Sequence, residues 1–121
     1  MEKFEVREVA SSKDKQKALE IRRIVFCHEQ GVNPALEFDG LDDNCRHYLA
    51  KSNGRAIGTA RIRQETPTTF KIERVAVLAE ERRQGVGKAL MKKTISDAKE
   101  TPSRIVKIHA QCHAENFYTS L

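Results

Sequence analysis

The chain has 121 residues, of which 39% are hydrophobic and 32% are charged, and its mean hydropathy is −0.60. This length supports one domain with a single core, which buries roughly 65–70% of the unfolded chain's surface. No apolar run approaches the ~20 residues of a membrane-spanning helix, and we expect no signal peptide at the polar N-terminus. Three cysteines are too few for a disulfide scaffold, so the sequence predicts a reduced, cytoplasmic protein.

The charge balance is basic, with 22 Lys and Arg residues against 17 Asp and Glu, a net charge of +5 and a pI of about 9.3. A basic pI is typical of proteins that bind polyanions. Aromatic residues make up only 6% of the chain, however, so the stacking platforms of nucleic-acid modules are not indicated. The basic excess gathers in the second half, at Arg82, Arg83, Lys88, Lys92, Lys93, Lys99, Arg104 and Lys107. A small anionic ligand accounts for that distribution as well as a duplex does.

The N-terminal segment predicts a strand, a helix and a loop. Residues 4–9 alternate weakly between apolar and polar, and Ser12 is a candidate N-cap for a helix that extends to Val25. Pro34 interrupts the next segment, which we expect to be a loop with a short helix.

A hairpin and a third strand follow. Asn53-Gly54 accepts the positive φ angles of a type I′ turn, so we expect strands over 47–51 and 55–63 to pair around it. Residues 70–77 read FKIERVAV and predict a third antiparallel strand in the centre of the sheet.

The C-terminal part predicts an amphipathic helix over 85–99, a strand over 103–110 and the start of a helix over 114–121. The order of elements is then β-α-(α)-β-β-β-α-β-α, in which a meander of strands precedes a β-α-β crossover. This order predicts an α/β (α+β) fold with a mixed, mostly antiparallel central sheet flanked by helices, in a single domain spanning 1–121.

The most informative segment joins the central strand to the amphipathic helix and contains Arg-Arg-Gln-Gly-Val-Gly at positions 82–87. Glycines let a ligand approach the backbone closely, and the first N–H groups of a helix have no partners within the helix. Together with the helix dipole they form an anion site suited to phosphate. A Walker A loop is excluded because Arg82 stands where its first glycine belongs, and Leu90 replaces the third glycine of the Rossmann pattern.

The remaining pattern, R-x-x-G-x-G after a strand, resembles the pyrophosphate loop of the GNAT superfamily of acyl-CoA N-acyltransferases. Gln111 with Asn116-Phe117-Tyr118 is similar to the next motif of that family. The first half resembles the ElaA-like branch through Arg22 to Phe26, Glu29-Gln30-Gly31-Val32, Glu37, Asp39 and His47. Family members continue past this motif with two more strands, so the resemblance implies that the sequence, which stops at Leu121, is C-terminally incomplete.

The resemblance implies acetyl-CoA as the acyl donor and assigns its binding residues. The pyrophosphate is expected on the backbone N–H groups of the loop, the pantetheine arm along the edge of the central strand, and a bulge or splay there is expected to direct an N–H at the acetyl oxygen. The implied cofactor-binding residues are Val75, Ala76, Val77, Arg82, Arg83, Gln84, Gly85, Val86, Gly87, Lys88 and Asn116.

The resemblance also implies candidates for proton transfer. Tyr118 holds the position that protonates the departing thiolate, the alternative being an aromatic residue that packs on the sheet. Glu73 on the central strand is a candidate base, and its alternative is a carboxylate paired with neighbouring Arg or Lys. Glu29 is a rival base or an anchor for the acceptor amine, unless it is only a solvated helix end.

Other reactive side chains are weaker candidates for a functional role. The spacing of Cys27-His28 and Cys45-x-His47 does not match zinc sites, so no metal is expected. His109 alternates along a strand and is expected to be packed or on the surface. Cys112 forms an acyl-enzyme only if its thiol is acidified, so direct transfer in a ternary complex is favoured.

The leading hypothesis is thus an N-acetyltransferase that acts on an amine of a small molecule, a peptide or a protein lysine. The alternative is a non-catalytic module, either one that senses CoA or a basic one that binds nucleic acid. Acidic residues that would suit a cationic acceptor are Glu29, Glu37, Asp39, Asp42 and Asp43, although acids in loops also simply confer solubility. We expect a monomer or a homodimer, with no membrane partner.

Overall fold

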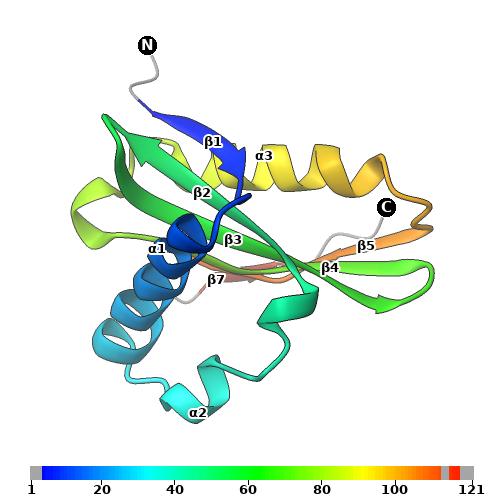
Figure 1. Ribbon diagram of the computed structural model, residues 1–121, viewed down its shortest axis with the longest axis horizontal. Coiled ribbons are helices and arrows are strands. Elements are labelled where there is room, and N and C mark those ends of the chain that lie inside the picture. Colours follow the sequence, from blue (N-terminus) through cyan, green and yellow to red (C-terminus); the bar gives the residue numbers. More distant parts are fainter. Residues whose placement is uncertain (1–3, 113–114, 118–121) are drawn as a thin grey trace.

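A five-stranded sheet with helices on both faces forms the protein in the computed structural model (Figure 1), which describes residues 4–112 and 115–117. Its elements are β1 (Glu5–Glu8), α1 (Ser12–Arg22), η1 (Arg23–Glu29), α2 (Pro34–Glu37), η2 (Asp42–Asn44), β2 (Arg46–Ser52), β3 (Arg55–Thr66), β4 (Thr69–Val77), η3 (Ala79–Glu81), α3 (Val86–Lys99), β5 (Ile105–Ile108), β6 (Ala110–Cys112) and β7 (Glu115–Phe117).

The sheet has the predicted mixed topology. Its strands lie in the order β1-β2-β3-β4-β5, antiparallel from β1 to β4, and β5 returns through α3 to lie parallel to β4. The turn between β2 and β3 places Asn53 at φ 52° and Gly54 at φ 80°, as the type I′ turn requires. The predicted fold class is therefore confirmed.

The first helix differs from its prediction at both ends. Its N-cap is Ser11, whose hydroxyl accepts a hydrogen bond from the backbone N–H of Asp14 at 3.1 Å, one residue earlier than expected. After Arg22 the helix continues as the π-helix η1, in which the N–H of Gln30 donates to the carbonyl of Val25. π-helical turns are rare and frequently occur near functional sites.

The C-terminal prediction needs correction. The expected strand over 103–110 is divided, because β5 ends at Ile108 and β6 begins at Ala110. The expected helix from Ala114 is wrong for its described part, because Glu115–Phe117 is the strand β7 and pairs antiparallel with β6. The remainder of that predicted helix, including Tyr118, lies outside the described residues.

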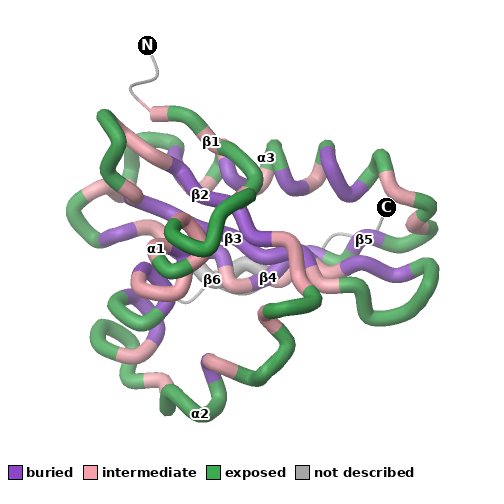
Figure 2. The backbone as a smooth tube through the Cα atoms, viewed as in Figure 1, coloured by how far each residue is buried: buried purple, intermediate pink, exposed green. Residues whose placement is uncertain are grey.

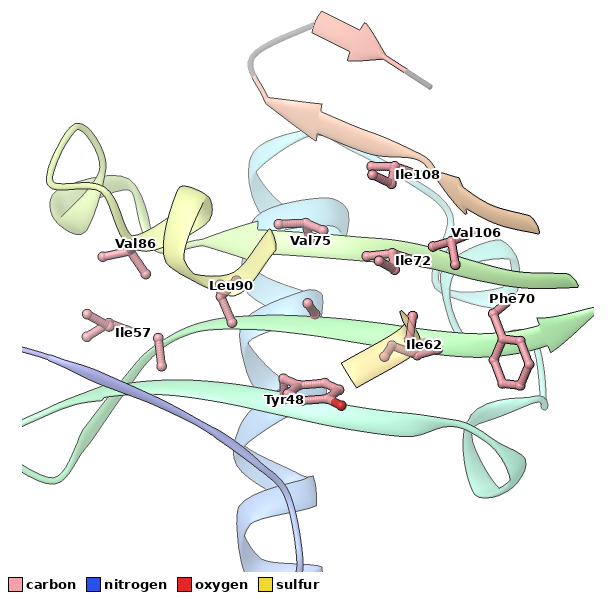
Figure 3. Packing of buried hydrophobic residues seen from close by; sticks show 13 residues of the cluster. Tyr48, Ile57, Ile62, Phe70, Ile72, Val75, Val86, Leu90, Val106 and Ile108 are labelled. Carbon is pink, nitrogen blue, oxygen red and sulfur yellow. The ribbon is translucent and has the colours of Figure 1, made fainter. Parts of the chain in front are cut away.

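Two apolar clusters cover the two faces of the sheet. Figure 2 shows buried stretches along the inner strands and in α1 and α3. On β2, Tyr48 and Ala50 belong to the cluster under α3, whereas Leu49 belongs to the cluster under α1. Figure 3 shows Val86 and Leu90 of α3 packed over the first cluster. The Tyr48 hydroxyl also donates to Asp97 Oδ2 at 2.6 Å, which fastens α3 to the sheet. This alternation is the period of two that a sheet covered on both faces requires.

Close packing of α3 depends on Gly58 in β3. A Cβ at this position would lie 3.0 Å from both Leu90 Cδ1 and Val86 Cγ1, and 3.2 Å from the carbonyl oxygen of Ala76. Because the carbonyl is backbone and both side chains are buried, we expect Gly58→Ala to lower the free energy of unfolding by about 1–3 kcal/mol, measured by urea titration.

Gly87→Ala is the matched control for that substitution. Its Cβ would meet only Val77 Cγ2, at 3.8 Å, and alanine favours helix over glycine by up to about 1 kcal/mol. Equal losses in both variants would contradict the packing argument.

Candidate functional site

The strand β4, which was predicted to be central and lies between β3 and β5, carries a β-bulge at Arg74. Thr59 of β3 pairs with Ala76 and Arg61 pairs with Glu73, so Arg74 and Val75 together stand opposite one residue of β3. Arg74 has φ 57°, in the left-handed region that residues other than glycine rarely adopt. Bulges of this kind bend a strand and redirect its side chains, and they are frequent beside active sites.

In a regular strand Glu73 would share a sheet face with Val75 and Val77, and the bulge prevents this. Val75 and Val77 pack in the cluster under α3, whereas Glu73 joins Arg61 on the face covered by α1. The extra residue shifts the alternation by one position, which a strict period of two could not anticipate.

The strand β5 leaves β4 at the same level as the bulge. The parallel ladder runs from Thr69 to Ile72, where Ile72 pairs with Ile108 and the N–H of His109 donates to the carbonyl of Ile72 at 2.8 Å. Beyond this point β6 pairs with β7 instead, and in Figure 3 the chain after Ile108 runs away from β4. Within the described part of the chain, residues 73–77 of β4 therefore have no ladder partner on this side.

The loop from β4 to α3 has the backbone of an anion site. Arg83 has φ 67° and Gly85 has φ 84°, and Gly85 is the N-cap of α3, with its carbonyl accepting from Ala89 N–H. Arg83, Gln84, Gly85 and Lys88 are exposed. The N–H groups at this helix start thus face a site with positive dipole and two basic side chains nearby.

Arg82 is already bound within the protein. Its Nη1 and Nη2 donate to the two carboxylate oxygens of Glu29 at 2.6 and 2.7 Å, and its Nε donates to the carbonyl of Val77 at 2.9 Å. The structure thus joins two residues for which the sequence predicted separate roles. Their bidentate pair fastens the loop to the end of η1.

A buried ionic network lies below α1 and centres on Arg61, whose side chain is 1% exposed. Arg61 Nη1 donates to Asp39 Oδ1 at 3.1 Å and to Asp42 Oδ1 at 2.9 Å, and Nη2 donates to Asp39 Oδ2 at 3.0 Å. Both Nη2 and Nε also donate to Glu73. Arg22, equally buried, donates to Asp42 Oδ1 at 2.6 Å and to Glu37 Oε2 at 2.8 Å. The network therefore ties α1 and the loop after α2 to β3 and β4.

Glu73 is held as a carboxylate by this network. Burial alone raises the pKa of a carboxyl, but hydrogen bonds from Arg63 and Arg61 outweigh it and lower the pKa of Glu73 to about 2. Lys71 Nζ lies 3.6 Å from its second oxygen. Of the two roles predicted for Glu73, these contacts correspond to the paired carboxylate.

A cavity of about 260 Å³ lies between the end of η1, α2 and the strands β4 and β5. It is lined by Phe26, Val32, Leu36, Glu37, Arg74, Val75 and His109. Val75 and Glu37 are among the residues that the sequence indicates, whereas His109 was expected to be packed or on the surface and Arg74 has no role in the predicted site. The position of His109 in the chain could have indicated its place in the cavity wall, because it comes directly after Ile108, the last residue that pairs with β4.

The five acidic residues proposed to attract a cationic acceptor all have cationic partners in this chain. Glu29 pairs with Arg82, and Asp43 pairs with Lys15. The other pairs are Glu37 with Arg22 and Arg74, Asp39 with Arg61 and Arg74, and Asp42 with Arg22 and Arg61. Their charge is therefore largely neutralised before any ligand binds.

The structure describes only some of the predicted C-terminal site residues. Asn116 lies in β7 opposite Gln111, and Tyr118 is outside the described residues. Over residues 4–112 and 115–117, no group of three or more His, Cys, Asp or Glu side chains is arranged to hold a metal ion. A search of the same residues finds no helix with the length and apolar character needed to cross a membrane.

Comparison with known proteins identifies close relatives. The model of the acetyltransferase (GNAT) family matches residues 13–121. The protein YyaT of Bacillus subtilis is 34% identical over 119 residues, covering 96% of this chain and 80% of its own length. ElaA of Escherichia coli is 36% identical over 108 residues, covering 84% of this chain and 69% of its own.

Solved structures share the fold. The crystal structure of E. coli ElaA superposes with a TM-score of 0.77 at 29% identity, covering 91% of this chain and 80% of that one. A GNAT family acetyltransferase from Brucella melitensis, crystallised in complex with acetyl-CoA, gives a TM-score of 0.76 at 13% identity, covering 98% of this chain and 86% of that one.

The ionic network generates a prediction for stability. Arg61→Met removes the guanidinium that Asp39, Asp42 and Glu73 share and leaves the buried carboxylate of Glu73 with weaker compensation, so we expect a loss of about 3–5 kcal/mol in the free energy of unfolding. Arg55→Met, which breaks an exposed pair with Glu80 and Glu81, should cost less than about 1 kcal/mol. Urea titrations of both variants test this, and similar losses would show that the network is not a central constraint.

The same network predicts loss of stability in acid. The pKa of Glu73 is lower in the folded than in the unfolded chain, so its contribution is complete above about pH 4.5 and disappears as the pH falls toward 2. Burial lowers the pKa of His47, so protonation of the unfolded chain adds an earlier loss below about pH 6.5. Melting temperatures measured from pH 7 to pH 3 should fall in these two stages, and a constant value to pH 4 would contradict both.

Proposed function

The chain belongs to the acetyltransferase (GNAT) family, and we propose from this that it transfers an acetyl group from acetyl-CoA to an amine by direct attack in a ternary complex. One observation carries the proposal: in the described part of the chain, residues 73–77 of β4 have no ladder partner on the side of β5, and this edge leads directly into the loop at the N-terminus of α3. A ligand with an extended arm and a pyrophosphate matches that combination. The acetyl-CoA complex of the Brucella melitensis protein, which has the same fold, supports the choice of cofactor.

We assign the pyrophosphate to the start of α3. The N–H groups from Arg83 to Lys88 would hold its oxygens, with the Lys88 and Arg83 side chains adding charge. Gln84, Gly85, Val86 and Gly87 supply the intervening backbone. Arg82 would act differently from its expected role, because it fastens the loop to Glu29 and so fixes the positions of the N–H groups.

The pantetheine arm is assigned to the edge of β4. There it would take the place of a neighbouring strand and pair with backbone groups of Val75, Ala76 and Val77. The bulge at Arg74 interrupts the regular hydrogen-bonding pattern at this edge. We propose that an N–H freed there donates to the thioester oxygen and stabilises the negative charge that develops during attack.

The departing thiolate requires a proton, and we propose that Tyr118 supplies it while Asn116 hydrogen-bonds the pantetheine. For Glu73 we propose the second of its predicted roles. A carboxylate with a pKa of about 2 takes up protons poorly at neutral pH, so Glu73 would hold Arg61 and Arg63 in place.

The cofactor site is tested by calorimetric titration with acetyl-CoA of the wild type and Gly85→Glu. The glutamate places a negative charge beside the proposed pyrophosphate, so we expect binding to weaken about 100-fold or more. The substitution also costs about 1–2 kcal/mol of stability, because a side chain at φ 84° is strained.

Gly40→Glu is the control, since Gly40 has φ 81° and, like Gly85, no atom within 4 Å of an added Cβ. It introduces the same charge and similar strain away from α3, and binding should be unchanged. A wild type that does not bind acetyl-CoA would refute the proposed function. Binding without acetyl transfer to any amine would favour the CoA-sensing module.

A further inference from the structure

The cavity between η1, α2, β4 and β5 lies beside the proposed thioester position, because Val75 belongs both to its wall and to residues 73–77 of β4, which no described strand pairs with on the side of β5. Three of its lining residues can carry charge, namely Glu37, Arg74 and His109. An amine that attacks the thioester must first lose a proton, so a base is needed where this cavity meets β4.

The carboxylates near this point are poorly suited to that task. Glu37 Oε2 accepts a hydrogen bond from Arg22 and lies 3.0 Å from Arg74 Nε. Glu73 contacts Arg61, Arg63 and Lys71. Protonating either carboxylate would break contacts with buried guanidinium groups, which is costly.

His109 is positioned differently. Its backbone N–H donates to the carbonyl of Ile72, which fixes the residue where β5 leaves β4, and its side chain is half-buried in the cavity wall. Imidazole is the most common general base in enzymes because its ordinary pKa is near neutrality. The charged groups that line the cavity with it are Glu37 from α2 and Arg74 from β4, which pair with each other.

We propose, resting on the proposed function, that His109 is the general base for the acceptor and that the cavity selects a primary amine with an apolar body. The ammonium gives one proton to the imidazole, and the neutral amine attacks the thioester carbon. A C–N bond forms and the C–S bond breaks, Tyr118 protonates the departing sulfur and takes up the second proton of the nitrogen, and His109 releases its proton to water.

The apolar preference follows from the rest of the cavity wall. Phe26, Val32, Leu36 and Val75 are apolar, and Leu36 remains 70% exposed, as a residue at an apolar entrance would be. Glu37 is committed to Arg22 and Arg74, so a second ammonium in the acceptor would be desolvated beside Arg74 without a free carboxylate.

The base is tested with acetyl-CoA and n-hexylamine, with release of free thiol as the readout. We expect His109→Gln to lower kcat about 100-fold and to remove the rise of kcat with pH, while the affinity for acetyl-CoA is unchanged. Added imidazole should restore activity to His109→Ala, which would not occur if the side chain only supported the fold. His28→Gln removes an exposed histidine from η1 and is expected to have no effect. Full activity and an unchanged pH profile in His109→Gln would overturn the assignment.

The acceptor class is tested by replacing n-hexylamine with cadaverine, which has the same number of non-hydrogen atoms but a second ammonium in place of the methyl group. We expect kcat/KM to favour n-hexylamine by about tenfold or more. Equal use or a preference for cadaverine would overturn the apolar selection. A wild type that binds acetyl-CoA but does not acetylate n-hexylamine overturns the inference and leaves the cofactor site in place, whereas absent acetyl-CoA binding refutes the proposed function itself.

Discussion

The buried guanidinium of Arg61 is the interaction on which the arrangement of this protein depends. One side chain on β3 contacts carboxylates from the loop after α2, from η2 and from β4, and the shared carboxylate of Asp42 extends these contacts to Arg22 on α1. Such a group is costly to desolvate and is tolerated only when every partner is in place. The segment from α2 to η2, whose residues Leu36 and Glu37 line the cavity, is therefore positioned by the same charges that hold β3 against β4.

The bulge at Arg74 works together with this network. With the extra residue, Glu73 contacts Arg61 and Arg74 contacts Glu37 in the network below α1, while Val75 turns to the apolar cluster under α3. Two consecutive charged residues on one face would be impossible in a regular strand. The cost of a left-handed arginine is thus offset by ion pairs with Glu37 and Asp39.

Local chemistry was sufficient to predict most of the fold. The Asn53-Gly54 turn, the apolar period of α3 and the glycine loop at its start each depend on neighbouring residues, and each was predicted from the sequence. The bulge, the departure of β5 from β4 and the pairing of Glu29 with Arg82 depend on segments far apart in the chain, and no local pattern encodes them. For the same reason His109 was assigned to the core or surface, because only the parting of two strands brings it to the cavity.

Among the described strands, residues 73–77 of β4 have no ladder partner on the side of β5, and this edge also bears on self-association. An edge of free N–H and C=O groups is a template on which another extended chain can add, as in domain swapping and amyloid formation. The bulge at Arg74 spoils the regular spacing that such an added strand requires, and the charged residues Glu73 and Arg74 stand at the start of the edge. A linear ligand can bind through only a few of the backbone N–H and C=O groups at this edge, whereas an added strand must pair with all of them in register. The bulge and the two charges thereby oppose the addition of a further strand at this edge.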